Sequence, residues 1–260
     1  MKLCILIILC LCSTFLYGKD LRTIEKELLK DLRKISYWKD FEAADSTISP
    51  WDSLSKANEN FNKKLLYYTS QEPSTLTYSF PELQKEHLII TTSKDKAFRI
   101  YSWDTDEGGS MRFFQNIFQF KIGIKVVSKN SDEQLDEGDP GGFYSEIFML
   151  KTGGKTYYLA IFNAVYSSKD CYQGLQAFSI ELNTLNFNAK IIKTQTGVKN
   201  KIGFNFDFFS VVDRKERPLR LISFDENEKI FRIPIVWENG KVTNKQITYK
   251  FDGKFFVKRG

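Results

Sequence analysis

Short strand-type segments joined by glycine-containing turns fill the chain beyond residue 72, and they restrict the folds open to it. Several are rich in Tyr, Phe, Ile and Val, and two alternate apolar and polar residues with the period of two that is typical of a half-buried strand. The predicted strands cover residues 88–92, 98–103, 155–166, 175–182, 204–208 and 247–251. The 23 phenylalanines fit this interpretation, because large aromatic side chains commonly fill sheet cores.

The connections between these segments indicate how the strands pair. Three dipeptides predict tight hairpin turns, namely Gly153-Gly154, Asn239-Gly240 and Asp252-Gly253. The second of them is the favoured pair for a type I′ turn, in which both central residues have positive φ. Because short turns join antiparallel neighbours, the sequence predicts a mainly β fold of antiparallel meander sheets, either sandwich-like or incomplete propeller-like.

Two helices are predicted ahead of the strands. Apolar residues recur at spacings of three and four between residues 21 and 35. A second helix starts with Ser49 as N-cap, Pro50 at the first helical position and Asp52 near the positive end of the dipole. We expect this helical segment, residues 19–72, to pack on the β-rich domain of residues 73–260, because an isolated helix pair buries little apolar surface.

The first 18 residues have the pattern of a secretory signal peptide. Lys2 precedes an apolar run that ends at Tyr17, and the small residue Gly18 follows. The run is too short for a membrane-spanning helix, which needs about 20 residues, and no second run of this kind follows. We therefore expect cleavage after Gly18, a secreted or periplasmic location and no transmembrane segment in the mature chain.

After this cleavage, the chain would hold few cysteine and histidine residues that could bind a metal or act as a nucleophile. Cys171 would be the one remaining cysteine, and His87 is the single histidine of the chain. A lone thiol closes no intrachain disulfide, and zinc sites usually draw on several His and Cys ligands. A Cys171–His87 dyad is an alternative, but a lone cysteine is more often a small buried hydrophobe.

Other sequence features argue against nucleotides and nucleic acid. The chain has no phosphate-binding loop and no Gly-x-Gly-x-x-Gly after a predicted strand. Its net charge of +6 is spread among interspersed acids and bases, which is typical of a solvated surface. Nucleotide cofactors and nucleic-acid partners are therefore not expected.

The acidic turn after residue 103 is the most pointed candidate site. Asp104, Asp106 and Glu107 lie beside Trp103 and two glycines, so we predict that Trp103, Asp104, Asp106 and Glu107 bind a ligand. Carboxylates in a glycine-containing loop can ligate Ca²⁺, which makes Asp104 and Asp106 the candidate metal ligands. The alternatives are an ordinary solvated hairpin loop and, for Trp103, core or cross-strand packing.

A second acidic segment covers residues 132–139 and ends in Pro140-Gly141-Gly142. Carboxylates from this segment and from residues 104–107 could together perform acid/base hydrolysis of a glycoside. The sequence does not decide whether the two loops converge. A solvated surface loop is the simpler interpretation of this composition.

The chain also resembles a group of uncharacterised exported proteins of Bacteroidetes-type bacteria. The resemblance lies in the segments IYSWDT at 100–105, GGSM at 108–111, YYLA at 157–160 and YKFDGKF at 249–255. It implies an exported location, in the envelope or beyond it, and it implies no mechanism.

These observations favour an exported β-rich binding or interaction protein of unknown ligand that presents its loops from a rigid sheet. A carboxylate-dependent hydrolase acting on glycans and a structural envelope component are the alternatives. A glycan or an envelope protein would be the partner. The sequence leaves open whether the protein is an enzyme.

Overall fold

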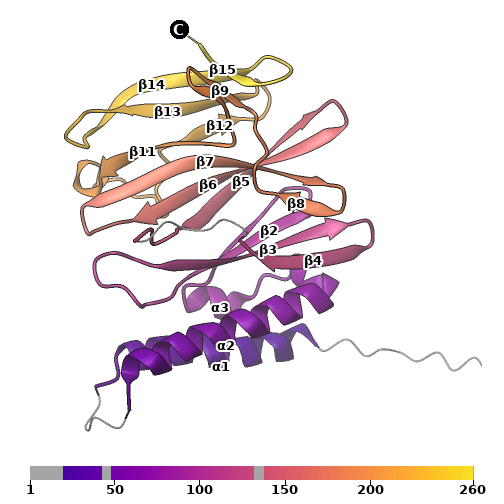
Figure 1. Ribbon diagram of the computed structural model, residues 1–260, viewed down its shortest axis with the longest axis vertical. Coiled ribbons are helices and arrows are strands. Elements are labelled where there is room, and N and C mark those ends of the chain that lie inside the picture. Colours follow the sequence, from indigo (N-terminus) through magenta and orange to yellow (C-terminus); the bar gives the residue numbers. More distant parts are fainter. Residues whose placement is uncertain (1–19, 43–47, 132–137, 260) are drawn as a thin grey trace, which may run out of the picture.

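A layer of helices and three stacked sheets make up the computed structural model of the chain, which describes residues 20–42, 48–131 and 138–259 (Figure 1). The predicted signal peptide lies outside these residues. The helical elements are α1 (Leu21–Lys39), α2 (Pro50–Gln71), the short 3-10 helices η1 (Pro73–Leu76) and η2 (Phe208–Val211), and α3 (Pro81–Lys85).

The two long helices form where the sequence predicts them. In α1 the residues at spacings of three and four, among them Ile24, Leu28 and Leu32, are buried. The backbone N–H of Asp52 donates to the Ser49 hydroxyl at 3.2 Å, so Ser49 caps α2 as predicted. The predicted mainly β class with two N-terminal helices is confirmed.

The first sheet is a four-stranded antiparallel meander in chain order. Its strands are β1 (Ile89–Thr92), β2 (Phe98–Asp104), β3 (Phe114–Ile122) and β4 (Lys125–Asn130). The second sheet has the order β11-β7-β6-β5, with β8 paired to β7. Its strands are β5 (Phe143–Thr152), β6 (Lys155–Val165), β7 (Asp170–Glu181), β8 (Thr184–Asn186) and β11 (Lys201–Asp207).

The third sheet has the order β10-β9-β15-β14-β13-β12. Its strands are β9 (Ile192–Thr194), β10 (Gly197–Lys199), β12 (Ser223–Asp225), β13 (Ile230–Val236), β14 (Val242–Phe251) and β15 (Phe256–Arg259). Its β15–β9 pair is parallel, whereas the other strand pairs of the described residues are antiparallel.

The predicted hairpin turns are present, with one difference in turn type. Gly153 and Gly154 both have positive φ between β5 and β6, and Gly253 does so between β14 and β15. Between β13 and β14 only Gly240 has positive φ, and its N–H donates to the Trp237 carbonyl. The prediction of a type I′ turn at Asn239-Gly240 is therefore wrong. A type I turn followed by Gly240 in the left-handed region closes this longer hairpin instead.

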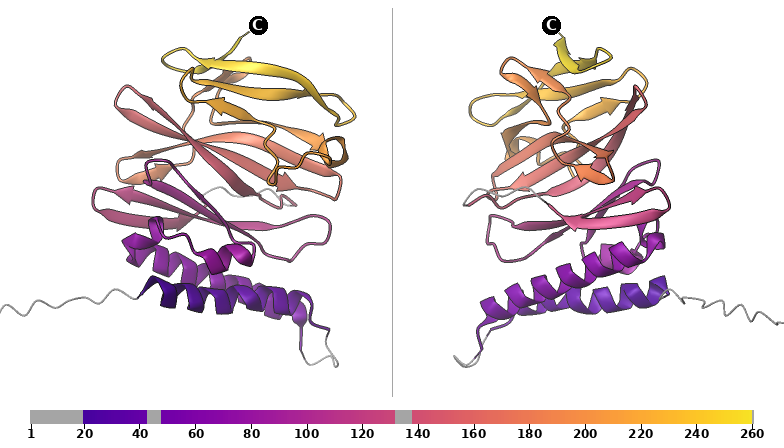
Figure 2. Two further views of the ribbon diagram at one scale, coloured as in Figure 1. Left: turned by 180° about the vertical axis from the view of Figure 1, so that it is seen from behind. Right: turned by 45° about the vertical axis from the view of Figure 1, so that its right-hand side comes forward.

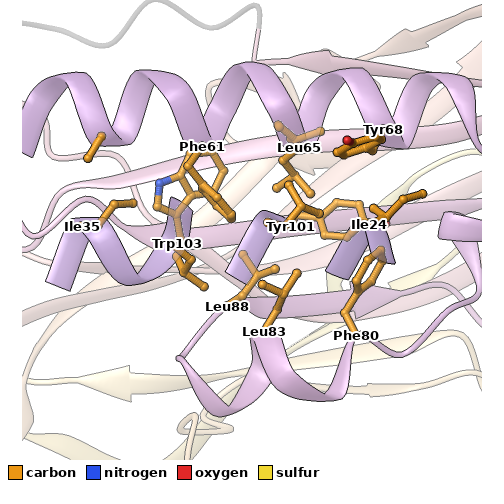
Figure 3. Close-up of a cluster of buried hydrophobic side chains, with 14 of the residues drawn as sticks. Ile24, Ile35, Phe61, Leu65, Tyr68, Phe80, Leu83, Leu88, Tyr101 and Trp103 are labelled. Carbon is orange, nitrogen blue, oxygen red and sulfur yellow. The ribbon is translucent and has the colours of Figure 1, made fainter. Parts of the chain in front are cut away.

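Apolar side chains fill each space between neighbouring layers. The core between the helices and the first sheet contains Phe61 and Leu65 from α2 and Tyr101 and Trp103 from β2 (Figure 3). Phe98, Phe118 and Phe178 belong to the core between the first two sheets, and Leu159, Phe231 and Phe256 to that between the second and third sheets. Both views in Figure 2 show the same order of layers. The first two sheets are thus buried on both faces.

Candidate functional site

Trp103, the aromatic member of the predicted site, lies in the core. Its side chain is 1% exposed and packs edge-on against Phe61 at 5.1 Å between ring centroids (Figure 3). The indole N–H donates to the Asn58 side-chain oxygen at 3.2 Å, and Asn58 in turn donates to the Thr105 carbonyl at 2.8 Å. Trp103 therefore joins α2 to the first sheet and presents no face to a ligand.

The next two members of the predicted site, Asp104 and Asp106, form ion pairs with cationic side chains of the protein. One oxygen of Asp104 accepts from the backbone N–H of Asp106 at 2.9 Å, and the other lies 3.2 Å from Arg112. Asp106 has positive φ, and its carboxylate lies 2.8 Å from Lys39 of α1 and 3.5 Å from Arg112. The pKa of Asp104 is raised, mainly because burial disfavours its charged form.

These pairs bear on the calcium hypothesis. Ca²⁺ takes six to eight oxygen ligands, whereas Asp104 and Asp106 already neutralise Lys39 and Arg112. In the parts of the chain that the structure describes, no three or more His, Cys, Asp or Glu side chains cluster as metal ligands would. The arrangement instead ties the turn after β2 to α1.

Glu107, the fourth predicted residue, lines a cleft of about 960 Å³ between α2 and one edge of the stacked sheets. Asp139, from the second acidic segment, lines the same cleft. The two acidic segments thus contribute to one concavity at these positions. Residues 132–137 of the second segment lie outside the described residues.

Three amide side chains form a connected group in this cleft. The side-chain nitrogen of Asn62, on α2, donates to Gln115 of β3 and to Asn130 of β4, each at 3.1 Å. Both N–H groups of Asn62 are used in this way, and its own oxygen remains. No side chain or backbone group of the described residues pairs with that oxygen or with the amide nitrogens of Gln115 and Asn130. We call Asn62, Gln115 and Asn130 the amide triad. It offers a ligand one hydrogen-bond acceptor and two donor groups.

Aromatic and charged groups complete the lining. Phe114 and Phe162 are partly exposed there, and the Lys201 ammonium lies 3.8 Å from the centre of the Phe162 ring. Lys63 pairs with Glu59 on the exposed side of α2 at 2.5 Å. The cleft thus combines neutral hydrogen-bonding groups, charges of both signs and aromatic faces.

The backbone approaches these side chains closely at Gly142. A Cβ atom built there would lie 2.2 Å from the Asn163 carbonyl oxygen and 2.5 Å from the Phe162 ring. The Gly142 carbonyl also accepts from the Asn116 side chain at 2.9 Å. Only glycine fits here, so the turn that carries Asp139 is held against β6 and β3.

The remaining nucleophile candidates lie elsewhere. Cys171 is buried on β7, and burial raises the pKa of its thiol to about 11, with Asp170 and Asp207 adding to the effect. The thiol is therefore neutral near neutral pH and a poor nucleophile. His87 is an exposed residue that precedes β1 in the first sheet, whereas Cys171 lies in the second sheet.

Of the four residues predicted as a ligand site, only Glu107 lines this cleft. The amide triad was not predicted, because single Asn and Gln residues on a helix and two strands carry no distinctive spacing. The Asn62 contacts span 53 and 68 residues of sequence. Only folding brings these side chains together.

Comparison with known proteins finds no matching family model, no matching curated protein and no matching solved structure. In the described ranges, no helix is both long and apolar enough to cross a membrane.

Proposed function

We propose that the protein is an exported binding protein that holds a polyhydroxylated ligand, such as a glycan, in the cleft between α2 and the sheet edge. The observation that carries the proposal is the amide triad of Asn62, Gln115 and Asn130. Each sugar hydroxyl both donates and accepts a hydrogen bond, so a site with donors and an acceptor side by side suits vicinal hydroxyls. The partly exposed rings of Phe114 and Phe162 offer apolar contact to a sugar face.

The pattern of the first 18 residues supports export. The stack of sheets supports a binding role, because binding residues are often positioned by a rigid scaffold. The buried, neutral Cys171 offers no nucleophile to a covalent mechanism.

Isothermal titration with a panel of bacterial envelope oligosaccharides tests the proposal. Replacing Asn62 by Ala should weaken binding about tenfold, since the variant loses one acceptor and releases the orientation of Gln115 and Asn130. Asn60→Ala on the exposed side of the same helix is the matched control and should bind like the parent. Equal affinities of the two variants for the bound sugar would contradict the proposal.

A glycan hydrolase is the second candidate, and the shared position of Glu107 and Asp139 in the cleft is the observation that favours it. Two carboxylates flanking a glycosidic bond are the usual requirement for this chemistry. Release of reducing ends from a bound oligosaccharide by the parent, but not by Glu107→Gln or Asp139→Asn, would establish hydrolysis. Binding without release would leave the binding protein as the function.

A further inference from the structure

The β3–β4, β5–β6 and β7–β8 turns of the first two sheets gather at one end of the stack. In Figure 1 the turns between β3 and β4, between β5 and β6 and between β7 and β8 all project to the right, and in the left view of Figure 2 they project to the left. Contacts hold the neighbouring layers together there. The Tyr158 hydroxyl donates to Asp95, in the β1–β2 turn, at 3.1 Å, and Lys94 pairs with Glu226 of the third sheet at 3.2 Å.

Two aliphatic residues stand at the tips of these turns. Ile124 is 91% exposed and Leu182 is 98% exposed, whereas the next most exposed large apolar side chain of the described residues, Tyr67, is 60% exposed. Leu182 and Asn183 both have positive φ, a combination that favours Gly or Asn at the first position. Folding therefore gains nothing from a leucine at 182.

Lysines without an ion pair lie in or beside the turns at this end of the stack. In the described residues, no ion pair engages the exposed side chains of Lys96, Lys121, Lys125 and Lys151. The acids of the β1–β2 and β7–β8 turns, Asp95 and Glu181, have partners of their own. Asp95 accepts from Ser93 and from the backbone N–H of Ala97, and Glu181 pairs with Lys155. Glu226 and Glu228 of the third sheet pair with Lys94 and Arg232.

We propose that this end of the molecule, the hairpin-tip face, docks on an anionic phospholipid bilayer, with Ile124 and Leu182 entering the acyl boundary and the four lysines contacting phosphate groups. Charge complementarity selects a negatively charged surface. Separate aliphatic tips on different turns form no contiguous apolar patch of the size that a stable protein interface needs. A bilayer accepts each tip independently, so it suits this arrangement better.

Sedimentation of the purified protein with phosphatidylcholine vesicles, with and without phosphatidylglycerol, tests the proposal. Binding should require the anionic lipid and should weaken as salt is added. Changing Lys96, Lys121, Lys125 and Lys151 together to Gln should weaken binding more than a hundredfold, at about fivefold for each lysine. The matched control carries the same change at four exposed lysines outside the tips, namely Lys30, Lys56, Lys215 and Lys245, and should bind like the parent.

Two further variants test the contribution of the apolar side chains at the tips. Ile124→Asn and Leu182→Asn should each weaken vesicle binding about tenfold, since each removes an inserted side chain. Leu182→Asn should also leave the thermal midpoint unchanged or raise it, because Asn tolerates positive φ better than Leu does. Loss of binding together with retained stability separates membrane contact from a folding defect.

Several outcomes would overturn the proposal. One is the absence of sedimentation with anionic vesicles while the protein is folded by circular dichroism. Another is equal binding of the tip-lysine variant and its matched control. Binding to soluble polyphosphate as tight as to vesicles, and unchanged in Ile124→Asn and Leu182→Asn, would show that the lysines recognise phosphate without a bilayer.

Discussion

Burial sets the chemistry of Cys171, the single cysteine of the chain beyond the predicted signal peptide. The side chain is 8% exposed in a cluster with Phe206, Val211 and Leu219. This environment disfavours the thiolate and raises the pKa to about 11 from an ordinary value of about 9. The residue therefore acts as a small apolar side chain, which is the simpler of the two roles that its sequence context allows.

The raised pKa predicts a loss of stability in alkali. Below pH 9 the thiol is neutral in both states, so its contribution to stability is fully present there. Above pH 9 the unfolded chain ionises first, and the contribution is lost as the pH rises through about 11. Between these values the free energy of unfolding of the parent should fall by up to about 3 kcal/mol more than that of Cys171→Ala. Urea denaturation of both proteins at each pH measures this, and parallel pH profiles would contradict it.

On strand β7, one buried side chain makes the hydrogen bonds that a neighbouring strand would otherwise make. Gln173 on β7 is fully buried, and its amide nitrogen donates to the Leu219 carbonyl and to Asn163, each at 2.8 Å. Its oxygen accepts from the backbone N–H groups of Leu221 and Ile222, each at 2.9 Å. The segment 219–222 forms no strand, so Gln173 supplies the partners that a neighbouring strand would offer.

Replacing Gln173 by Met should therefore be costly although the volume is similar. The variant leaves the Leu219 carbonyl, the Asn163 side-chain oxygen and two backbone N–H groups buried without these partners, and we expect the free energy of unfolding to fall by about 3 kcal/mol or more. Gln195→Met, in the exposed turn between β9 and β10, is the matched control and should change stability by less than about 0.5 kcal/mol. Similar values for the two variants, measured by chemical denaturation, would show that the Gln173 contacts are dispensable.

In the residues that the structure describes, three cores between neighbouring layers hold the four layers together, beside the smaller cluster around Cys171. Phe61, Phe178 and Phe231 are each 0% exposed, and they belong to the first, second and third of these cores. Since β2 and β3 supply side chains to two cores at once, loosening one layer exposes apolar surface on the next. We therefore expect the layers to unfold together.

Three substitutions test this cooperativity. Phe61→Ala, Phe178→Ala and Phe231→Ala should each lower the free energy of unfolding by about 3–5 kcal/mol, because each leaves a large cavity. In each variant, tryptophan fluorescence and far-ultraviolet circular dichroism should report one coincident transition. A separate early transition in Phe231→Ala would show that the third sheet unfolds independently.

Local sequence signals determined most of the secondary structure. Apolar spacing and the Ser49 cap predict the helices, and six strand predictions each overlap an observed strand. The signals were weakest where a strand is buried on both faces or short. The sequence FQNIFQFKI of β3 supplies side chains to two cores and so lacks the clean alternation of a half-buried strand, and β9 and β10 have only three residues each.

Only the tertiary structure decided which faces meet. The sequence alone placed acids beside Trp103, but packing turned Trp103 into the core, paired Asp104 and Asp106 with Arg112 and Lys39, and brought Glu107 to the cleft with Asp139. The amide triad and the hairpin-tip face likewise depend on contacts between residues that are 53 to 132 positions apart. Caps, turns and periodicity act within a few residues and can be read directly, whereas the stacking of layers is set by the summed burial of distant apolar side chains.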